Sequence, residues 1–388
     1  MKSTVSGRET LLLLCRVLSD NPLIRAQAIA ELSDEEARAA VIALAQTEEV
    51  LPAFYQAISA FPECLPKPER IQLAVGHEAN RRKNRQIRDS VIEIAREAER
   101  HSIEIVALKG ARWAIEDSAG FAAWRSMLDI DILVRVEDYG AMRGILAQLD
   151  YHSTRREHNF LGQRRFSGHY HLVALRRGGQ PFVTEVHRHV EWRPALLPTE
   201  LIFEASRQVA PGLRLPCLWH AALHAIIHWQ IHHFGYQLGF HRMKDGIDIA
   251  RFLGRADVDW DALAAHVARV GIHREVDAGL ATVIELFGAS APPQFRPSLA
   301  TRRYVTKALQ ARESRLLMWE AKQHQRIERL WHDHRFVYRM DLRKTNPVAT
   351  RIGLWALRVR RLPFLISHVA SIAILRTATS LQRALRSR

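Results

Sequence analysis

Apolar residues follow a helical period over the first hundred positions of the chain. Among charged residues they recur three or four positions apart at Ile87, Val91, Ile94, Ala95 and Ala98. This spacing places them on one face of a helix. Upstream, Ser33 begins a Ser-Asp-Glu-Glu stretch with Glu36 three residues on, the pattern of a capping box at a helix start. We therefore expect residues 1–100 to be helical.

After residue 100 the period changes to that of short buried strands. Residues 103–108 and 128–134 are β-branched, apolar runs typical of strands, and the first ends in a tight turn at Lys109-Gly110. An amphipathic helix is indicated over residues 139–149. We therefore expect two strands of a sheet, followed by a helix.

Two more strands and a second helical region complete the predicted fold. The strands are expected at residues 169–175 and 183–190, with Arg177-Gly178-Gly179-Gln180 as a hairpin turn. From about residue 197 the pattern is helical and stays so. The predicted class is α+β, a small mixed-sheet core flanked by helical regions. The expected segments are a helical N-terminal region (1–100), the core (101–195), a helical region completing a cleft (196–300) and a basic helical tail (301–388).

Charge is unevenly distributed along the chain. The 388 residues are 47% hydrophobic, which suits a packed core, and carry a formal net charge of +15. Residues 301–388 hold 20 Lys and Arg against 5 Asp and Glu, so the tail accounts for the surplus. With its aromatic residues this tail could contact nucleic acid, another polyanion or, from Trp355 to Leu375, an anionic membrane surface. A helical subdomain with a solvated arginine face is the alternative.

The cysteines and the longest apolar runs bear on location. Cys15, Cys64 and Cys217 are far apart and form no CxxC pattern, which indicates a reduced, cytoplasmic protein. No run reaches the roughly 18 apolar residues that a membrane span requires. We expect no transmembrane segment, and peripheral membrane contact remains open.

Two aspartates share one face of the strand predicted at 128–134. Side chains alternate along a strand, so Asp129 and Asp131 point the same way while Ile130 and Ile132 point into the core. Paired carboxylates repel one another unless a cation lies between them, and oxygen ligands suit Mg²⁺, which also coordinates substrate phosphates. An Asp-x-Asp pair that merely ends a strand is the alternative interpretation.

A third carboxylate, Glu185, lies in the strand predicted at 183–190. If the two strands are neighbours, Asp129, Asp131 and Glu185 converge, and such a set can bind the two metal ions of a phosphoryl or nucleotidyl transfer. The segment 244–249 contains a similar acidic alternation, Asp245 to Asp248. It is assigned to a helix, with Asp248 buried or capping a turn, and is not counted as a metal site.

Five segments occur in a characteristic order. They are Ile105-Val106-Ala107-Leu108-Lys109-Gly110, Arg125 with Leu128-Asp129-Ile130-Asp131-Ile132-Leu133-Val134, Leu149-Asp150-Tyr151, His169-Tyr170-His171 and Thr184-Glu185-Val186-His187. Together they resemble the nucleotidyltransferase superfamily of DNA polymerase β type. More closely, they resemble the bacterial family described as uncharacterised nucleotidyltransferase. The resemblance extends over residues 80–250.

This resemblance implies an ATP- or other NTP-dependent transferase. It would move a nucleoside monophosphate to an acceptor hydroxyl and release pyrophosphate. Asp129 and Asp131 map onto the family's metal-binding pair and Glu185 onto its third carboxylate, so these three are the catalytic and Mg²⁺-binding candidates. Two Mg²⁺ ions are expected.

Nucleotide contacts are expected from two turns. The superfamily's usual Gly-Ser turn is replaced by Lys109-Gly110, where the lysine can act as a point charge on phosphate. Arg125 and the adjacent Ser126 are further nucleotide-binding candidates. For Arg125 the alternative is an ordinary solvated arginine.

Twenty histidines are present, and four step by four along a predicted helix: His220, His224, His228 and His232. Histidines at i and i+4 can bind a transition metal, but no acidic residue completes the motif locally, so a structural or cleft-lining role is expected. His224 and His228 are candidates for the acceptor pocket. His187 shares a face with Glu185 and is either a third pocket residue or a satisfied core histidine.

Three function classes remain. The first is a magnesium-dependent nucleotidyltransferase acting on a hydroxyl of a small molecule, peptide or protein. The second is an RNA-directed nucleotidyltransferase, which only the basic tail favours. The third is a catalytically inactive binding or regulatory protein of the same fold. An inactive protein has no reason to keep three mutually repelling carboxylates. We therefore favour the first class.

Overall fold

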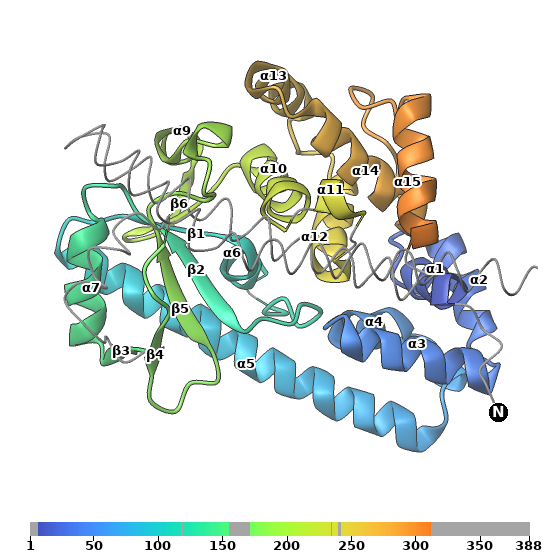
Figure 1. The fold of residues 1–388 in the computed structure, drawn as a ribbon. Coiled ribbons are helices and arrows are strands. Elements are labelled where there is room, and N and C mark those ends of the chain that lie inside the picture. Colours follow the sequence, from blue (N-terminus) through green and yellow to red (C-terminus); the bar gives the residue numbers. More distant parts are fainter. Residues whose placement is uncertain (1–6, 118, 155–170, 234, 240–241, 312–388) are drawn as a thin grey trace, which may run out of the picture. The chain divides into compact units, whose positions relative to one another are not determined.

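The computed structural model describes residues 7–117, 119–154, 171–233, 235–239 and 242–311 (Figure 1). By internal contacts the chain divides into two units. The first comprises residues 1–156 and 170–313 and contains every described residue. Most of the basic tail, including the stretch from Trp355 to Leu375, lies outside the described residues, as do His169 and Tyr170.

The N-terminal part is helical, as its apolar period predicts. Its elements are α1 (Gly7–Val17), α2 (Pro22–Glu31), α3 (Glu35–Thr47), α4 (Leu51–Ile58), the 3₁₀ turn η1 (Pro62–Cys64) and the long α5 (Lys67–Arg100). The start of α3 corrects the predicted capping box. Asp34, not Ser33, is the cap residue, and its carboxylate accepts a 2.8 Å hydrogen bond from the Ala37 amide. The Ser33 hydroxyl donates to the Ala30 carbonyl of the preceding helix instead, so it is not available to cap α3.

A mixed sheet of seven strands forms the centre of the described chain, in the order β3-β4-β5-β2-β1-β7-β6. The strands are β1 (Ile105–Ala107), β2 (Asp129–Leu133), β3 (Tyr151–Ser153), β4 (Leu175–Arg177), β5 (Val183–His187), β6 (Arg207–Ala210) and β7 (Leu213–Leu215). β2 runs parallel to β5 and antiparallel to β1, while β1 runs parallel to β7. The α+β class with a mixed sheet is therefore confirmed.

Two details of the strand prediction are wrong. The helical pattern expected from residue 197 onward is interrupted by β6 and β7, which form a hairpin and extend the sheet past residue 195. Both strands are short; Arg207 and Gln208 of β6 are exposed, and β7 has only one apolar-polar-apolar repeat, Leu213-Arg214-Leu215. The strand expected at 169–175 is reduced within the described residues to one bridge from His171 to His187, and β4 begins only at Leu175.

Helices complete the fold around the sheet. α6 (Lys109–Glu116) follows β1, and α7 (Tyr139–Gln148) follows β2. Later elements are η2 (Pro194–Leu196), α9 (Thr199–Ala205), α10 (Leu218–Ile227), the π-turn η3 (His228–His232), α11 (Gly235–Leu238), α12 (Met243–Leu253), α13 (Trp260–Val270), α14 (His273–Phe287) and α15 (Leu299–Ala311). α5 contacts α6, α7, β1 and β7, and α10 contacts α12 and α14. Within the described part of the chain, no helix is both long and apolar enough to cross a membrane.

Candidate active site

Strand pairing brings the three predicted carboxylates to one face of the sheet. β2 and β5 are neighbours, and their parallel register places Asp131 directly opposite Glu185 and Asp129 opposite Val183. Because side chains alternate along a strand, Asp129, Asp131 and Glu185 all project from the same face. Ile130 and Ile132 are fully buried on the other face. The condition set by the sequence, that the two strands be adjacent, is therefore met.

Asp131 is the most enclosed of the three carboxylates, and two basic side chains contact one of its oxygens. Its Oδ1 accepts a 2.9 Å hydrogen bond from Lys109 Nζ and lies 2.8 Å from His187 Nε2. Burial alone would raise the pKa of Asp131, but the Lys109 charge and the His187 contact hold this pKa well below its ordinary value. Asp131 is therefore an anion in the folded protein.

The other two carboxylates have no such compensation. Burial and the nearby charge of Asp131 raise the pKa of Asp129, and Lys109, Lys244 and Arg125 offset this only in part. Burial and Asp131 likewise raise the pKa of Glu185, whose Oε2 lies 3.8 Å from His187 Nε2. Neighbouring carboxyl groups whose pKa values are raised are stabilised in their charged forms by a cation, so the raised values indicate a place where a cation could bind.

Lys109 and Gly110 are the first two residues of α6 and form the turn by which the chain leaves β1. Lys109 has a φ of +43°, in the left-handed region that a non-glycine residue adopts at a cost of about 1–3 kcal/mol. Burial would lower the pKa of Lys109, but Asp131 and Asp129 raise it. Gly110 permits a close approach, since a Cβ at this position would lie 2.5 Å from Arg125 Nη1 and 2.6 Å from Met127 Sδ. The turn thus aims a cation at the carboxylates and leaves room for Arg125.

Arg125 is buried, so its interpretation as an ordinary solvated arginine is wrong. Its side chain is 5% exposed and forms a bidentate ion pair with Asp248 of α12, with Nε to Oδ1 at 2.9 Å and Nη2 to Oδ2 at 2.8 Å. Asp248 is also buried, which was one of the two alternatives predicted for it; the other was capping a turn. The pair joins the loop before β2 to the C-terminal helices. A nucleotide-binding role for Arg125 stays a prediction.

Asparagines of α5 fix the same loop from its other side. Asn80 Nδ2 donates to the carbonyls of Ala123 and Arg125 at 2.8 and 3.0 Å, and Asn84 Nδ2 donates to those of Ala122 and Arg125, both at 2.9 Å. Both asparagines are buried. These bonds tie three backbone carbonyls of the loop to α5, in addition to the 2.8 Å bond from the Arg125 amide to the Ala122 carbonyl, and so fix the entry of the chain into β2.

Removing one partner of the buried ion pair should cost much stability. We expect Asp248→Ala to lower the free energy of unfolding by about 3–5 kcal/mol, because the Arg125 charge remains buried and unpaired. Urea denaturation followed by circular dichroism would measure the change. The double replacement Arg125→Met with Asp248→Leu should recover most of the loss, since it leaves no buried charge. A double variant as unstable as Asp248→Ala would contradict this explanation.

One pocket brings together several of the predicted site residues. Lys109, Arg125, His224 and His228 all line it, with Asp245 and Asp248 from α12. Gly110, Ser126 and His187 are not among its lining residues: Ser126 is half-buried in the loop before β2, and His187 contacts Asp131. Lys109 thus connects the pocket with the carboxylates.

The pocket histidines are neutral at physiological pH. Burial, followed by the charge of Lys109, lowers the pKa of His224 to about 3 and that of His228 well below its ordinary value. They can therefore donate or accept hydrogen bonds, but they do not offer the positive charge of an imidazolium to a phosphate.

Two lysines near Asp129 were missed by the sequence analysis. Lys244 lies at the start of α12, and its charge partly offsets the rise in the pKa of Asp129 that burial and Asp131 cause. Lys83 of α5 lies close enough to Asp129 and Lys244 for both charges to act on its pKa, which burial lowers. Neither lysine belongs to a motif, and only the packing of α5 and α12 near β2 reveals them. They add positive charge beside the carboxylates.

Comparison with known protein families gives one match. The model of the family described as Uncharacterised nucleotidyltransferase matches residues 34–288, about two thirds of the chain. This range includes β1, β2 and β5, the Lys109-Gly110 turn and the pocket. Neither the curated proteins nor the solved structures compared with the chain give a significant match.

Proposed function

This chain belongs to the uncharacterised nucleotidyltransferase family, and we propose that it transfers a nucleoside monophosphate from a Mg²⁺-bound NTP to a hydroxyl of a small molecule, peptide or protein. The pairing of Asp131 with Glu185 on adjacent parallel strands, with Asp129 on the same face, carries this proposal. It supplies the three carboxylates that metal-assisted nucleotidyl transfer requires. The same arrangement suits the DNA polymerase β-type superfamily.

The carboxylates fit Mg²⁺ by their chemistry. All three offer oxygen ligands, which Mg²⁺ prefers, and their number leaves coordination positions for water and substrate phosphates. Burial, followed by the negative charge of Asp131, raises the pKa values of Asp129 and Glu185, so a cation beside them would stabilise their charged forms. When bound, Mg²⁺ would supply Lewis-acid stabilisation of the charge that develops on the phosphate oxygens. Asp129 and Asp131 would hold two ions, and Glu185 the one nearer the acceptor.

The residues around the carboxylates would position the nucleotide. Lys109, Lys83 and Lys244 contribute positive charge near Asp129, and this charge would offset that of the triphosphate. In the reaction the acceptor oxygen forms a bond to the α-phosphorus, and the bond from that phosphorus to the bridging oxygen of pyrophosphate breaks. Pyrophosphate leaves with the electron pair of that bond.

The acceptor hydroxyl must lose its proton in this step. Glu185 would hold the ion that lowers the pKa of this hydroxyl; its side chain is 25% exposed, while that of Asp131 is 2% exposed and engaged by Lys109 and His187. The proton would then pass to solvent water. The pocket with His224 and His228 lies on the other side of Lys109 and would receive the acceptor.

Transfer of label from α-³²P-NTPs into a cell extract tests the proposal. We expect a labelled product that requires Mg²⁺ and is absent with the Asp129→Ala/Asp131→Ala variant. The size of the product and its sensitivity to protease or ribonuclease would separate a metabolite, a protein and an RNA acceptor. An RNA product would favour the alternative that the basic tail suggests. Failure to transfer label, with no binding of Mg²⁺–NTP by calorimetry, would leave an inactive binding or regulatory protein.

Location is proposed from the sequence and from the state of the cysteines. Cys15, Cys64 and Cys217 are free thiols, which supports a cytoplasmic location. Contact of the basic tail with a membrane surface or a polyanion stays a prediction, since residues 312–388 lie outside the described part of the chain.

A further inference from the structure

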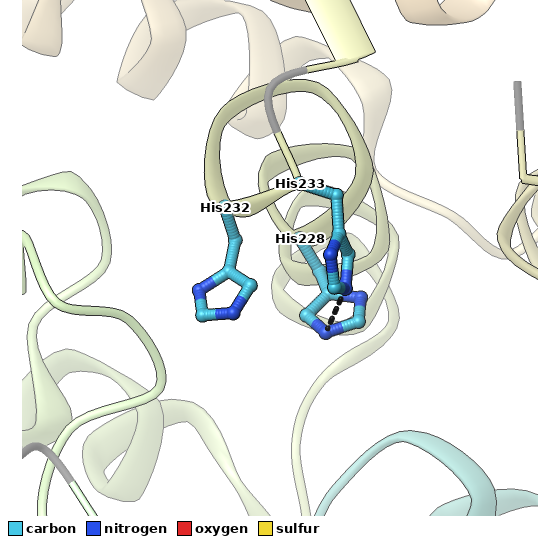
Figure 2. Close-up of side chains that lie close together, drawn as sticks. All are labelled: His228, His232 and His233. Carbon is cyan, nitrogen blue, oxygen red and sulfur yellow. Dashed lines mark hydrogen bonds between the residues drawn. The ribbon is translucent and has the colours of Figure 1, made fainter. Parts of the chain in front are cut away.

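Three histidines converge where α10 ends. His228, His232 and His233 leave the π-turn on the same side, and Figure 2 shows the rings of His228 and His233 meeting nitrogen to nitrogen with His232 beside them. One ring nitrogen from each lies within 4.8 Å of the corresponding atoms of the other two. The cluster differs from the series of histidines spaced by four along the sequence, because it includes His233 and excludes His220 and His224.

The π-turn explains why His233 lies beside His228 and His232. The amide of His233 donates to the carbonyl of His228 at 3.0 Å, five residues back, so this turn contains one residue more than an α-helical turn. In a regular α-helix the residues three and four positions on share the face of His228, and the residue five positions on does not. The wider turn brings the residue five positions on to that face as well. π-turns of this kind occur frequently at functional sites.

The separation of two ring nitrogens fits a shared metal ion. His228 Nε2 and His233 Nε2 lie 3.2 Å apart. Two imidazole nitrogens on a tetrahedral Zn²⁺, each about 2.0–2.1 Å from the ion, are separated by about 3.3 Å. Neutral imidazole is the form of histidine that binds metal.

Carboxylates stand behind two of the three rings. Glu191 Oε1 lies 3.1 Å from His232 Nδ1, and Asp245 Oδ1 lies 3.5 Å from His228 Nδ1. Both acids are buried, Glu191 fully and Asp245 to all but 4%. Histidine ligands of metals usually donate their second ring N–H to such a carboxylate, which fixes the ring and increases its basicity. The two acids would also balance the charge of a divalent ion.

We propose that His228, His232 and His233 bind a divalent transition-metal ion of the zinc class, with Glu191 and Asp245 as their hydrogen-bond acceptors. Three imidazoles leave one position of a tetrahedral ion for water or another ligand. His228 also lines the pocket that contains Lys109, so the ion would be held at the wall of that pocket. This site differs in ligands and in preferred metal from the carboxylates of β2 and β5, and it does not depend on the proposed nucleotidyl transfer.

Zinc content of the full chain, purified without a histidine tag, tests the site. We expect about one equivalent of zinc per chain to be lost in His233→Gln and retained in Glu185→Gln. This pair of variants is needed because Asp131, Glu185 and His187 form a second group that could hold a metal ion. His273→Gln removes an exposed histidine and serves as a further control that should keep its zinc. Glu191→Gln should weaken zinc binding roughly 10- to 100-fold.

Substitution with Co²⁺ gives a second test that needs no variant. The wild-type protein loaded with Co²⁺ should show the intense visible absorption bands of a tetrahedral ion, because three imidazoles and one further ligand impose that geometry. Weak bands typical of octahedral Co²⁺, or zinc lost from Glu185→Gln but not from His233→Gln, would overturn the proposal. Circular dichroism of each variant would identify any that fails to fold.

Discussion

Asp129→Asn will reduce nucleotidyl transfer by about 10²–10³-fold and will at the same time stabilise the Mg²⁺-free protein. Activity should fall because the variant loses a charged ligand beside Asp131. Stability should rise because the pKa of Asp129 is raised by burial and by Asp131, which means that the folded protein disfavours this charge. Loss of function with a gain in stability is the behaviour of a residue kept for catalysis.

Asp131→Asn is the matched control. It should reduce transfer to a similar extent, but it should destabilise the protein. The pKa of Asp131 is held below its ordinary value by Lys109 and His187, so its charge stabilises the fold. Replacement would leave the buried Lys109 ammonium without the negative charge that it now contacts at 2.9 Å. Two adjacent aspartates on one strand are thus expected to have equal effects on activity and opposite effects on stability.

The dependence on pH provides an internal check of the Asp129 prediction. A carboxyl group with a raised pKa costs stability above that pKa, and the cost disappears as pH falls below the ordinary value of 3.8. The gain in stability of Asp129→Asn over wild type should therefore be larger at pH 7 than at pH 4. Thermal unfolding with EDTA would measure it. A variant less stable than wild type at pH 7 would contradict this account.

Acid will unfold the protein between about pH 6.5 and 4. His220 and His224 of α10 are 1% and 5% exposed, and burial lowers their pKa values to about 4 and about 3. Both are neutral in the folded chain, so their contribution to stability is complete above 6.5 and is lost as pH falls toward the folded pKa values. At pH 4 each costs about 3 kcal/mol, at 1.36 kcal/mol per pKa unit. The total of about 6 kcal/mol approaches the stability of a typical domain.

His220→Leu should move this transition to lower pH. Within the described chain neither ring nitrogen of His220 has a hydrogen-bond partner, so leucine removes a titrating group without leaving a donor or acceptor unpaired. The exposed His101 offers the comparison, because His101→Gln should leave the acid midpoint unchanged. Far-ultraviolet circular dichroism against pH would give both midpoints. Equal shifts in the two variants would show that burial is not the cause.

The central strands and the carboxylates could be predicted because both depend on alternation within a strand. Ile130 and Ile132 are fully buried, so the parity of β2 fixes the side on which Asp129 and Asp131 project. That parity holds whatever the neighbouring strand is. Adjacency to β5 could only be stated as a condition, since strand order is set by the packing of the whole sheet.

Other parts of the site depend on contacts that local patterns do not encode. Arg125 and Asp248 are separated by 123 positions, and only the packing of α12 beside the loop before β2 brings them together. The metal-binding potential of His233 was missed because counting by four assumes an α-helix, and the π-turn adds a residue. β6 and β7 were missed because β6 has exposed polar residues and the alternation of β7 spans only three residues, too few to distinguish a strand.

The sheet order also determines when the site can form during synthesis. β1 and β2 are central, yet β2 pairs with β5 and β1 pairs with β7, where Ile105 meets Leu213. Contacts between segments so far apart form slowly, whereas helices α1 to α4 make most of their contacts with one another and with α5, and these contacts can form early in synthesis. The nascent chain therefore orders its helical part first. Asp131 acquires its neighbour Glu185 only after β5 has been made, so the charges that repel one another are brought together late.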